Sequence, residues 1–420
     1  MNDRAIVAGL GFATSIGNSG ERVAACLRDL KPGFERVDYL GSEKHGVHVV
    51  GTVKGFSVDS PHWQKWRAPE GSLPPKRLLM GLPPHGVYAY HAVLAALEDA
   101  GLTAEDLANE RTGLYCASAG SAFLTWYNLN RMHESEGARG APFGVLSSIA
   151  GTLNFNLGAF FGIKGCNLGF ASACASSAHA LGYAWEEIIS GRQDRMVVIG
   201  AEDINAESVL PFAAMRTLSA SKDPECPCRP FDANRDGFVS SGGAAVVILE
   251  SPAANKERNG PRACEMLGWG QSSDGYSPAI PDPEGGGIER AMRLALERSG
   301  QSAGAIDYVN AHATGTGAGD LAEGRALLRL FEKEVPPISS TKGLTGHPLS
   351  MAGAMEAAFC ALALREGFVP GSAGFEASED ELAALPVLRQ TEMRAPHQIL
   401  SNSCGFGGSN VSLVLVRPVE

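Results

Sequence analysis

The sequence lacks a long apolar run, an excess of basic residues and a paired set of cysteines. No apolar run approaches the roughly 20 residues needed to span a bilayer, and the opening MNDRAIVAGLGFATSIG has neither the basic nor the apolar region of a secretory signal. The net charge of −11 argues against a general nucleic-acid binder. Nine irregularly spaced cysteines fit a reducing compartment better than a disulfide framework. We therefore expect a cytoplasmic protein that binds neither membrane nor nucleic acid.

Motifs for metals and nucleotides are also missing or incomplete. Cys226 and Cys228 form a lone CxC with no second pair at zinc spacing. The loop that opens at Asp232 resembles the start of a calcium site, but Gly243 stands where its bidentate carboxylate should be. The amino-terminal glycines are too irregular for a dinucleotide fingerprint. We expect no metal and no resident cofactor.

What the sequence does contain predicts a layered α/β enzyme. Its 420 residues exceed the usual size of one core, and 44% of them are hydrophobic, which suits two packed halves. Strand-like apolar runs alternate with helix-period segments, at 5–10, 113–117, 196–199, 244–249, 306–310 and 409–416. The polar, breaker-rich segment 250–262 separates the halves, so we expect domains at 1–252 and 253–420.

One cysteine has the surroundings of a nucleophile. Cys174 lies in GFASACASSAH, a run of small residues that precedes a helix-period segment. The unpaired N–H groups and positive dipole of a helix start favour a thiolate, so we expect a lowered pKa for this thiol. Small neighbours would let an acyl carbonyl approach the sulfur. A lone cysteine of this kind is more often an inert buried thiol, so other motifs must decide.

Three motifs downstream supply that context. His312 lies in NAHATGTGAGDLAE after a strand-like run, Lys342 and His347 lie in STKGLTGH before a helix, and 401–410 reads SNSCGFGGSN between two strands. Either histidine alone is more often a structural residue. The four motifs together are far more specific.

With these residues in their order, the chain resembles the β-ketoacyl-acyl-carrier-protein synthases of the type I/II elongating class, in the thiolase superfamily. The resemblance runs from the amino-terminal AIVAGLGFATSIG through RPFDANRDGFV at 229–239 to the carboxyl end. It implies a thiolase-like α/β fold of two similar halves in five αβαβα layers. It also implies an acyltransferase that is typically dimeric and receives acyl chains on the phosphopantetheine of an acyl carrier protein.

The resemblance implies a role for each residue of the motifs. Cys174 would accept the acyl group, and His312 and His347 would form the histidine pair that stabilises the enolate of a decarboxylating malonyl thioester. Lys342 would be ion-paired with Glu323 behind the site, which would keep it protonated. The implied reaction is a decarboxylating Claisen condensation.

Other positions would bind the substrate. Thr314 and Thr316 match threonines that contact the pantetheine arm, and Phe212 matches an aromatic residue of the acyl pocket. Phe406 matches a gating phenylalanine whose backbone N–H joins that of Cys174 in an oxyanion hole.

The sequence departs from the family at several positions, and two alternative functions stay open. Cys404 replaces the usual aromatic of NSFGFGG, and Ser350 and Met351 stand in the usual GAAG. One alternative is a non-decarboxylating thiolase with Cys404 as a second thiol. The other is a partner subunit of the chain-length-factor kind in a ketosynthase heterodimer, although such partners usually lack the nucleophile that Cys174 provides.

The segment 61–84 also stands out, with six prolines, two tryptophans and four basic residues. It reads as a surface excursion. A solvated loop and a docking patch for an acidic carrier protein explain its charges equally well.

Overall fold

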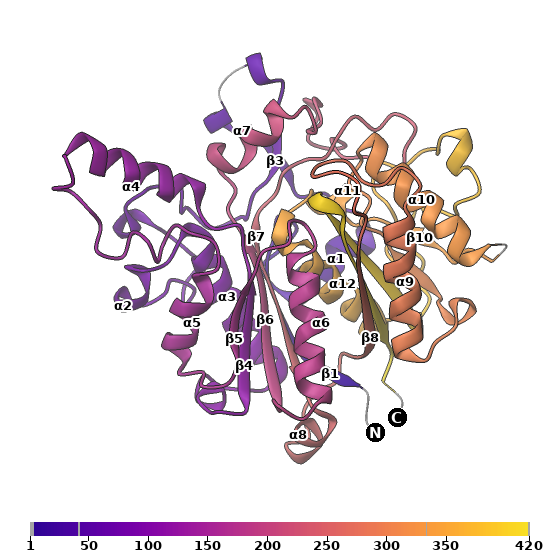
Figure 1. Ribbon diagram of the computed structural model, residues 1–420, viewed down its shortest axis with the longest axis horizontal. Helices are drawn as coiled ribbons and strands as arrows, with labels where there is room; N and C mark the ends of the chain where they lie inside the picture. The colour runs from indigo at the N-terminus through magenta and orange to yellow at the C-terminus, as the bar shows by residue number, and fades with distance from the viewer. Residues whose placement is uncertain (1–3, 41–42, 333, 419–420) are drawn as a thin grey trace.

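The computed structural model describes residues 4–40, 43–332 and 334–418, and within them one mixed sheet contains ten strands (Figure 1). Their order across the sheet is β10-β9-β11-β12-β8-β1-β7-β6-β4-β5. The first half of the chain supplies β1 (Ala5–Ala13), β4 (Thr112–Ala117), β5 (Asn167–Phe170), β6 (Arg195–Glu202) and β7 (Gly243–Glu250). The second half supplies β8 (Cys264–Ser273), β9 (Tyr308–Asn310), β10 (Ile338–Ser339), β11 (Gln398–Gly405) and β12 (Ser409–Val416).

The two halves of this sheet repeat one pairing pattern. They meet where Ala5 to Val7 of β1 pair with β8 in antiparallel register. Outward from β1, the first two pairs, β1–β7 and β7–β6, are antiparallel, and the next two, β6–β4 and β4–β5, are parallel. Outward from β8, the pairs β8–β12 and β12–β11 are likewise antiparallel, and the pairs β11–β9 and β9–β10 are parallel. The expected duplication is therefore confirmed, while the exact division at residue 252 stays a prediction.

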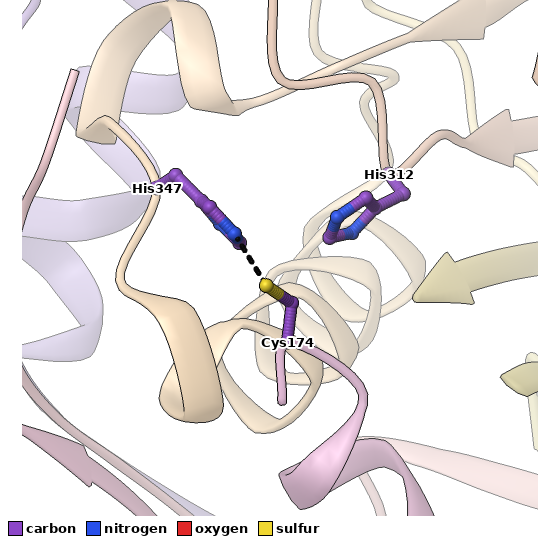
Figure 2. A group of neighbouring side chains, drawn as sticks. All are labelled: Cys174, His312 and His347. Carbon is purple, nitrogen blue, oxygen red and sulfur yellow. Dashed lines mark hydrogen bonds between the residues drawn. The ribbon is translucent and has the colours of Figure 1, made fainter. Parts of the chain in front are cut away.

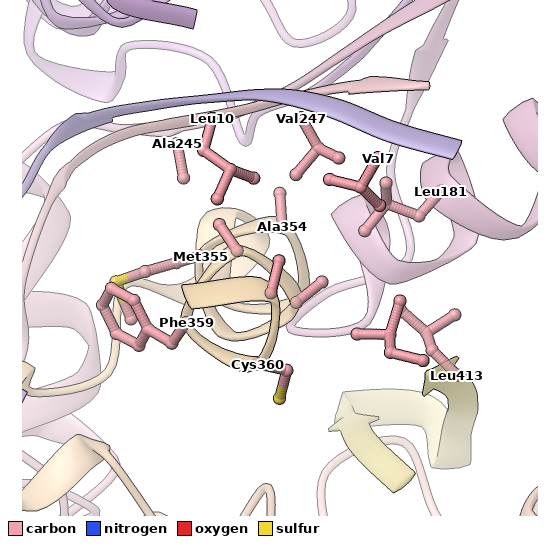
Figure 3. Packing of buried hydrophobic residues seen from close by; sticks show 14 of the residues in the cluster. Val7, Leu10, Leu181, Ala245, Val247, Ala354, Met355, Phe359, Cys360 and Leu413 are labelled. Atoms are coloured by element: carbon pink, nitrogen blue, oxygen red, sulfur yellow. The ribbon is translucent and has the colours of Figure 1, made fainter. Parts of the chain in front are cut away.

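Two helices, α6 (Ser176–Ile189) and α12 (Ala352–Glu366), lie between the two halves of the sheet (Figures 1 and 3). Helix α12 reads AGAMEAAFCALALRE, and residues 352–364 are all buried. A helix that is apolar on every side is stable only in a core, which explains its central place. A Cβ on Gly353 would lie 2.5 Å from the backbone nitrogen of Ala178, so glycine is what allows these helices to touch.

The outer faces of the sheet are covered by further helices. Helix α3 (Pro84–Ala100) packs on β1 and β7, and a Cβ on Gly11 would lie only 1.8 Å from the carbonyl oxygen of Ala92. Helices α9 (Gly286–Ser299) and α10 (Gly317–Phe331) cover the other half. The result is the expected αβαβα order of five layers.

Shorter elements complete the fold. They are α1 (Gly20–Asp29), α2 (Lys76–Leu79), α4 (Ala122–Glu134), α5 (Leu153–Phe161), α7 (Ala206–Ala214), α8 (Pro252–Glu257), α11 (Lys342–Thr345) and a two-stranded ribbon of β2 (Phe34–Arg36) and β3 (Val49–Gly51). Among the described residues, no helix is both long enough and apolar enough to cross a bilayer.

The segment 61–84 is more than the surface excursion that its composition suggested. Trp66 is 1% exposed and packs in the core beneath α3, where its indole N–H donates to the carbonyl of Ser60. Leu78 and Leu79 of α2 join the same core. The basic side chains Lys65 and Lys76 remain exposed, so the segment is an anchored loop with a charged outer surface.

Candidate active site

Cys174 lies in the short turn between β5 and α6 (Figure 2). Ala173 before it has φ +49, and the N–H of Ser172 donates to Oγ of Ser176 at 2.8 Å. A non-glycine residue in the left-handed region is strained unless its surroundings hold it, and such strain concentrates at functional sites. The turn thereby presents the thiol at the start of the central helix, as the sequence predicted.

Both histidines come from loops of the second half of the chain. His312 follows β9, and His347 follows α11. Nε2 of His347 lies 2.9 Å from Sγ of Cys174, and the two imidazole rings are 5.2 Å apart and nearly perpendicular. Figure 2 shows the two rings on either side of the sulfur. The tertiary structure thus brings together the three side chains that the motifs singled out.

Lys342 has a different ion-pair partner from the one expected. Its ammonium pairs with Glu356 of α12, and both side chains are completely buried. Glu323 makes no ion pair with it. Glu356 occupies the centre of the apolar helix and projects toward Lys342, whereas the carboxylate of Glu323 is saturated by other donors. The expected Lys342–Glu323 pair is therefore wrong.

Glu323 instead holds the loop that carries His312. Its two carboxylate oxygens accept the backbone N–H groups of His312 at 2.9 Å and Ala313 at 2.7 Å. Oε1 also accepts from the side-chain amide of Asn402, on β11, at 3.0 Å. Burial raises the pKa of Glu323, and these donors oppose the rise. The carboxylate fixes the backbone on which the imidazole sits.

The expected lowering of the Cys174 pKa is wrong. Burial raises the pKa of this thiol to about 12, against the opposing charge of Lys342. The backbone N–H groups of Phe406 and Cys174 also lower it, but by less than burial raises it. A helix start that is closed off from water stabilises a thiolate less than the solvent would. The resting thiol therefore keeps its proton, and His347 is the base in contact with it.

Both histidines are neutral in this environment. Burial and the charge of Lys342 hold the pKa of His312 and of His347 well below the usual range. The Lys342 ammonium lies 3.4 Å from Nδ1 of His312 and can only donate there, so the imidazole proton stays on Nε2. Nδ1 of His347 is buried without a hydrogen-bond partner in the described part of the chain, while its Nε2 contacts the thiol.

A cavity of about 220 Å³ opens in front of the three side chains. Its walls include every residue for which a substrate-binding role was expected, namely Phe212, Thr314, Thr316 and Phe406. The threonine hydroxyls lie 3.1 Å apart, and the rings of Phe212 and Phe406 are 6.3 Å apart. A Cβ on Gly405 would lie 3.0 Å from the nitrogen of Cys174, so the absence of a side chain there lets the end of β11, with Phe406 after it, lie close to Cys174. The backbone N–H groups of Phe406 and Cys174 both lie close enough to the Cys174 thiol to lower its pKa.

The departures from the family pattern have different surroundings. Cys404 lines the cavity, but burial raises the pKa of its thiol well above the usual value, with Glu323 and Asp274 adding to the rise. A thiol held in its protonated form is a poor base. Ser350 donates to Glu202, a buried carboxylate at the end of β6.

The same three side chains also have the spacing of a small metal site. Their ligand atoms lie within 4.8 Å of one another. However, the Lys342 ammonium beside His312 would repel a cation, and it keeps a proton on the nitrogen that would bind one. The arrangement suits proton transfer and hydrogen bonding better than metal binding.

Sequence reasoning missed two residues of this site. Glu356 is a single carboxylate in an otherwise apolar run of α12, and a charge isolated in that way indicates a buried partner. Phe238 packs its ring edge-on to His347, with centroids 5.3 Å apart, and nothing in the sequence around it pointed to that contact.

Family models and related sequences both match this chain to the same protein family. A family model described as the beta-ketoacyl synthase N-terminal domain matches residues 2–254, and the corresponding C-terminal model matches 263–376. The chain is 35% identical to 3-oxoacyl-[acyl-carrier-protein] synthase 1 of Haemophilus influenzae over 99% of both chains.

Solved structures agree with the sequence comparison. A beta-ketoacyl synthase from Burkholderia phymatum superimposes with a TM-score of 0.90 at 30% identity and covers 99% of this chain and 100% of its own. The ishigamide ketosynthase/chain length factor superimposes with a TM-score of 0.87 at 27% identity over 99% of both chains.

Proposed function

Because the chain belongs to the β-ketoacyl synthase family, we propose that it condenses an acyl group held on Cys174 with a malonyl group carried by an acyl carrier protein. The product is a β-ketoacyl thioester two carbons longer, together with carbon dioxide. The observation that carries this proposal is the 2.9 Å contact between Nε2 of His347 and the thiol, with His312 facing the same cavity.

In the first half-reaction, the acyl group moves from the carrier thioester to Cys174. Sγ attacks the carbonyl carbon while its proton passes to Nε2 of His347. The oxyanion lies between the N–H groups of Phe406 and Cys174. The carrier arm leaves as a thiolate and takes the proton from His347, which returns to its neutral state.

In the second half-reaction, the malonyl thioester loses carbon dioxide and its bonding electrons move into an enolate. His312 is the donor whose proton is fixed on Nε2, because Lys342 occupies Nδ1. Nε2 of His347 lies beside the same sulfur, so the second imidazole also borders the place where the enolate forms. The enolate carbon attacks the Cys174 thioester, the carbon–sulfur bond breaks, and the cysteine sulfur leaves as a thiolate that takes up one proton from solvent water.

Lys342 and Glu356 act behind the histidines. Their buried ion pair keeps a positive charge next to His312, which prevents that imidazole from becoming protonated. A neutral donor stabilises an enolate without giving up its proton to it. We assign Lys342 this electrostatic role and no step of proton transfer.

The substrate arm fits the remaining residues of the cavity. Thr314 and Thr316 would hydrogen-bond the phosphopantetheine arm, and Phe212 and Phe406 would flank the acyl chain. We propose that no other cofactor takes part and that the protein acts as a homodimer. We also propose that it works in the cytoplasm, because its nine cysteines are all free thiols. The exposed Lys65 and Lys76 would meet the acidic surface of the carrier.

Two measurements test the proposed function. Intact-mass spectrometry after incubation with a panel of acyl-carrier thioesters should show one acyl group on the wild type and none on Cys174→Ala. Product analysis with malonyl and acetyl donors should then show condensation with malonyl alone. Equal rates with the acetyl donor would establish the non-decarboxylating thiolase reaction instead.

The similarity to a ketosynthase/chain length factor structure keeps one alternative in view. In that case the chain would be a partner subunit of a heterodimer. Absence of an acyl adduct on the isolated protein, together with condensation only after a related ketosynthase is added, would establish that role.

A further inference from the structure

The turn that follows His347 has a strained backbone. Leu349 adopts φ +48, in the left-handed region that a branched side chain rarely occupies. Leu349 also lines the active-site cavity, and it begins the short helix η6 (Leu349–Met351). Such a conformation persists only where neighbouring contacts hold it. The base in contact with Cys174 therefore depends on whatever fixes this turn.

On one side, the backbone of His347 is held by hydrogen bonds. Its N–H donates to the carbonyl of Val239 at 2.7 Å, and its carbonyl accepts from Ser241 at 3.2 Å. On the other side of Leu349, the hydroxyl of Ser350 donates to Oε2 of Glu202. The exposed fractions of Ser350 and Glu202 are only 4% and 2%, so water does not compete for this bond.

Close packing places Ser350 above Glu202. A Cβ on Gly200 would lie 2.9 Å from Cα of Met351, so the absence of a side chain there brings η6 onto the end of β6. The hydroxyl of Ser350 thereby comes within hydrogen-bond distance of the Glu202 carboxylate.

Glu202 is itself held from the opposite side. The N–H of Ala119 donates to its carboxylate. The neighbouring carboxylate, Asp203, accepts from Nδ1 of His85 at 2.7 Å and from Ser121 at 2.6 Å. Nε2 of His85 in turn lies 2.8 Å from Oγ of Ser118. The end of β6 is thus a rigid acceptor for Ser350.

We propose that Ser350 and Glu202 are positioning residues, which hold the turn after His347 and thereby keep its imidazole against the Cys174 thiol. The inference rests on the proposed function, because that imidazole is the base of the acyl transfer. The two residues act through His347 and do not touch the substrate.

The charge of Glu202 gives the pair a second effect. Burial raises the pKa of Glu202 to about 7, against the bond from Ser350 and the charge of His85, while Asp203 adds to the rise. Ionised Glu202 in turn raises the pKa of Cys174. The groups that face Glu202 are therefore His85, Asp203, Ser350 and the catalytic thiol. Above about pH 7 its negative charge disfavours the developing thiolate.

The rate of alkylation of Cys174 by iodoacetamide tests both effects without any acyl substrate. Ser350→Ala removes the bond and should slow alkylation about fivefold at pH 6. At pH 8 the slowing should be smaller, because loss of the bond also raises the pKa of Glu202 and so reduces the negative charge that opposes the thiolate. Glu202→Gln keeps an acceptor oxygen and removes the charge. It should match the wild type at pH 6 and alkylate severalfold faster at pH 8. Ser148→Ala, at another buried serine, is the control and should change neither rate.

Thermal melts of each variant separate a positioning effect from unfolding. A Ser350→Ala protein with the melting temperature and alkylation rates of the wild type would overturn the proposal. If Ser350→Ala melts early, the near-isosteric Glu202→Gln decides: an unchanged pH profile would refute the role of Glu202. Failure of the wild type to condense malonyl thioesters, with these alkylation differences intact, would instead refute the proposed function.

Discussion

The ammonium of Lys342 lies 3.4 Å from Nδ1 of His312, while Nε2 of His347 lies 2.9 Å from the sulfur of Cys174. The first contact fixes one imidazole as a hydrogen-bond donor. The second leaves the other imidazole free to accept the thiol proton. Two histidines in one cavity therefore have different tasks, because only one of them touches the lysine.

This difference predicts distinct defects for the two histidine variants. His347→Ala removes the base in contact with the thiol and should slow acylation of Cys174 by about 10² or more. His312→Ala should leave acylation near the wild-type rate and lose most malonyl decarboxylation, since it removes the fixed donor to the enolate. Rapid-quench mass spectrometry measures the first step, and release of labelled carbon dioxide measures the second. Equal acylation rates in the two variants would contradict the assignment.

The raised pKa of Cys174 predicts an alkylation rate that keeps increasing with pH. With a thiol pKa of about 12, the thiolate fraction at neutral pH is small and rises about tenfold per pH unit. We expect no plateau up to pH 9, apart from a shallow inflection near pH 7 from Glu202. Peptide mapping after iodoacetamide treatment assigns the rate to Cys174. A plateau below pH 8 would show instead that the folded protein stabilises the thiolate.

The buried Lys342–Glu356 pair predicts a large loss of stability when one partner is removed. Glu356→Ala leaves a buried ammonium without its counter-ion, which costs about 3–5 kcal/mol of unfolding free energy. The control is Glu392→Ala, which breaks the exposed pair with Arg394 and should cost below about 1 kcal/mol. Urea denaturation measures both. Similar losses in the two variants would mean that the Lys342 charge is not enclosed as described.

The exposed charges of segment 61–84 predict a salt-sensitive interaction with an acidic carrier. Reversing two of them, in a Lys65→Glu, Lys76→Glu double variant, should raise KM for the carrier substrate by about tenfold and leave kcat unchanged. Alkylation of Cys174 should also be unchanged, since neither side chain reaches the cavity. Lys256→Glu, at an exposed position of α8, is the matched control. A KM that stays the same in the double variant would favour a merely solvated loop.

Much of this protein follows from local sequence. The order and spacing of the motifs around Cys174, His312, His347 and 401–410 indicated the reacting groups, because each motif fixes its own turn and the start of its own helix or strand. The alternation of apolar runs likewise predicted two α/β halves, since strand and helix periods are properties of short segments.

The tertiary structure decided the electrostatics. Glu356 rather than Glu323 pairs with Lys342, because the apolar helix that carries Glu356 is buried next to the lysine. The thiol is hard to ionise because burial outweighs the helix start, and the Ser350–Glu202 bond joins residues 148 positions apart. Desolvation and contacts across such distances depend on which surfaces pack together, and no local pattern of residues records that packing.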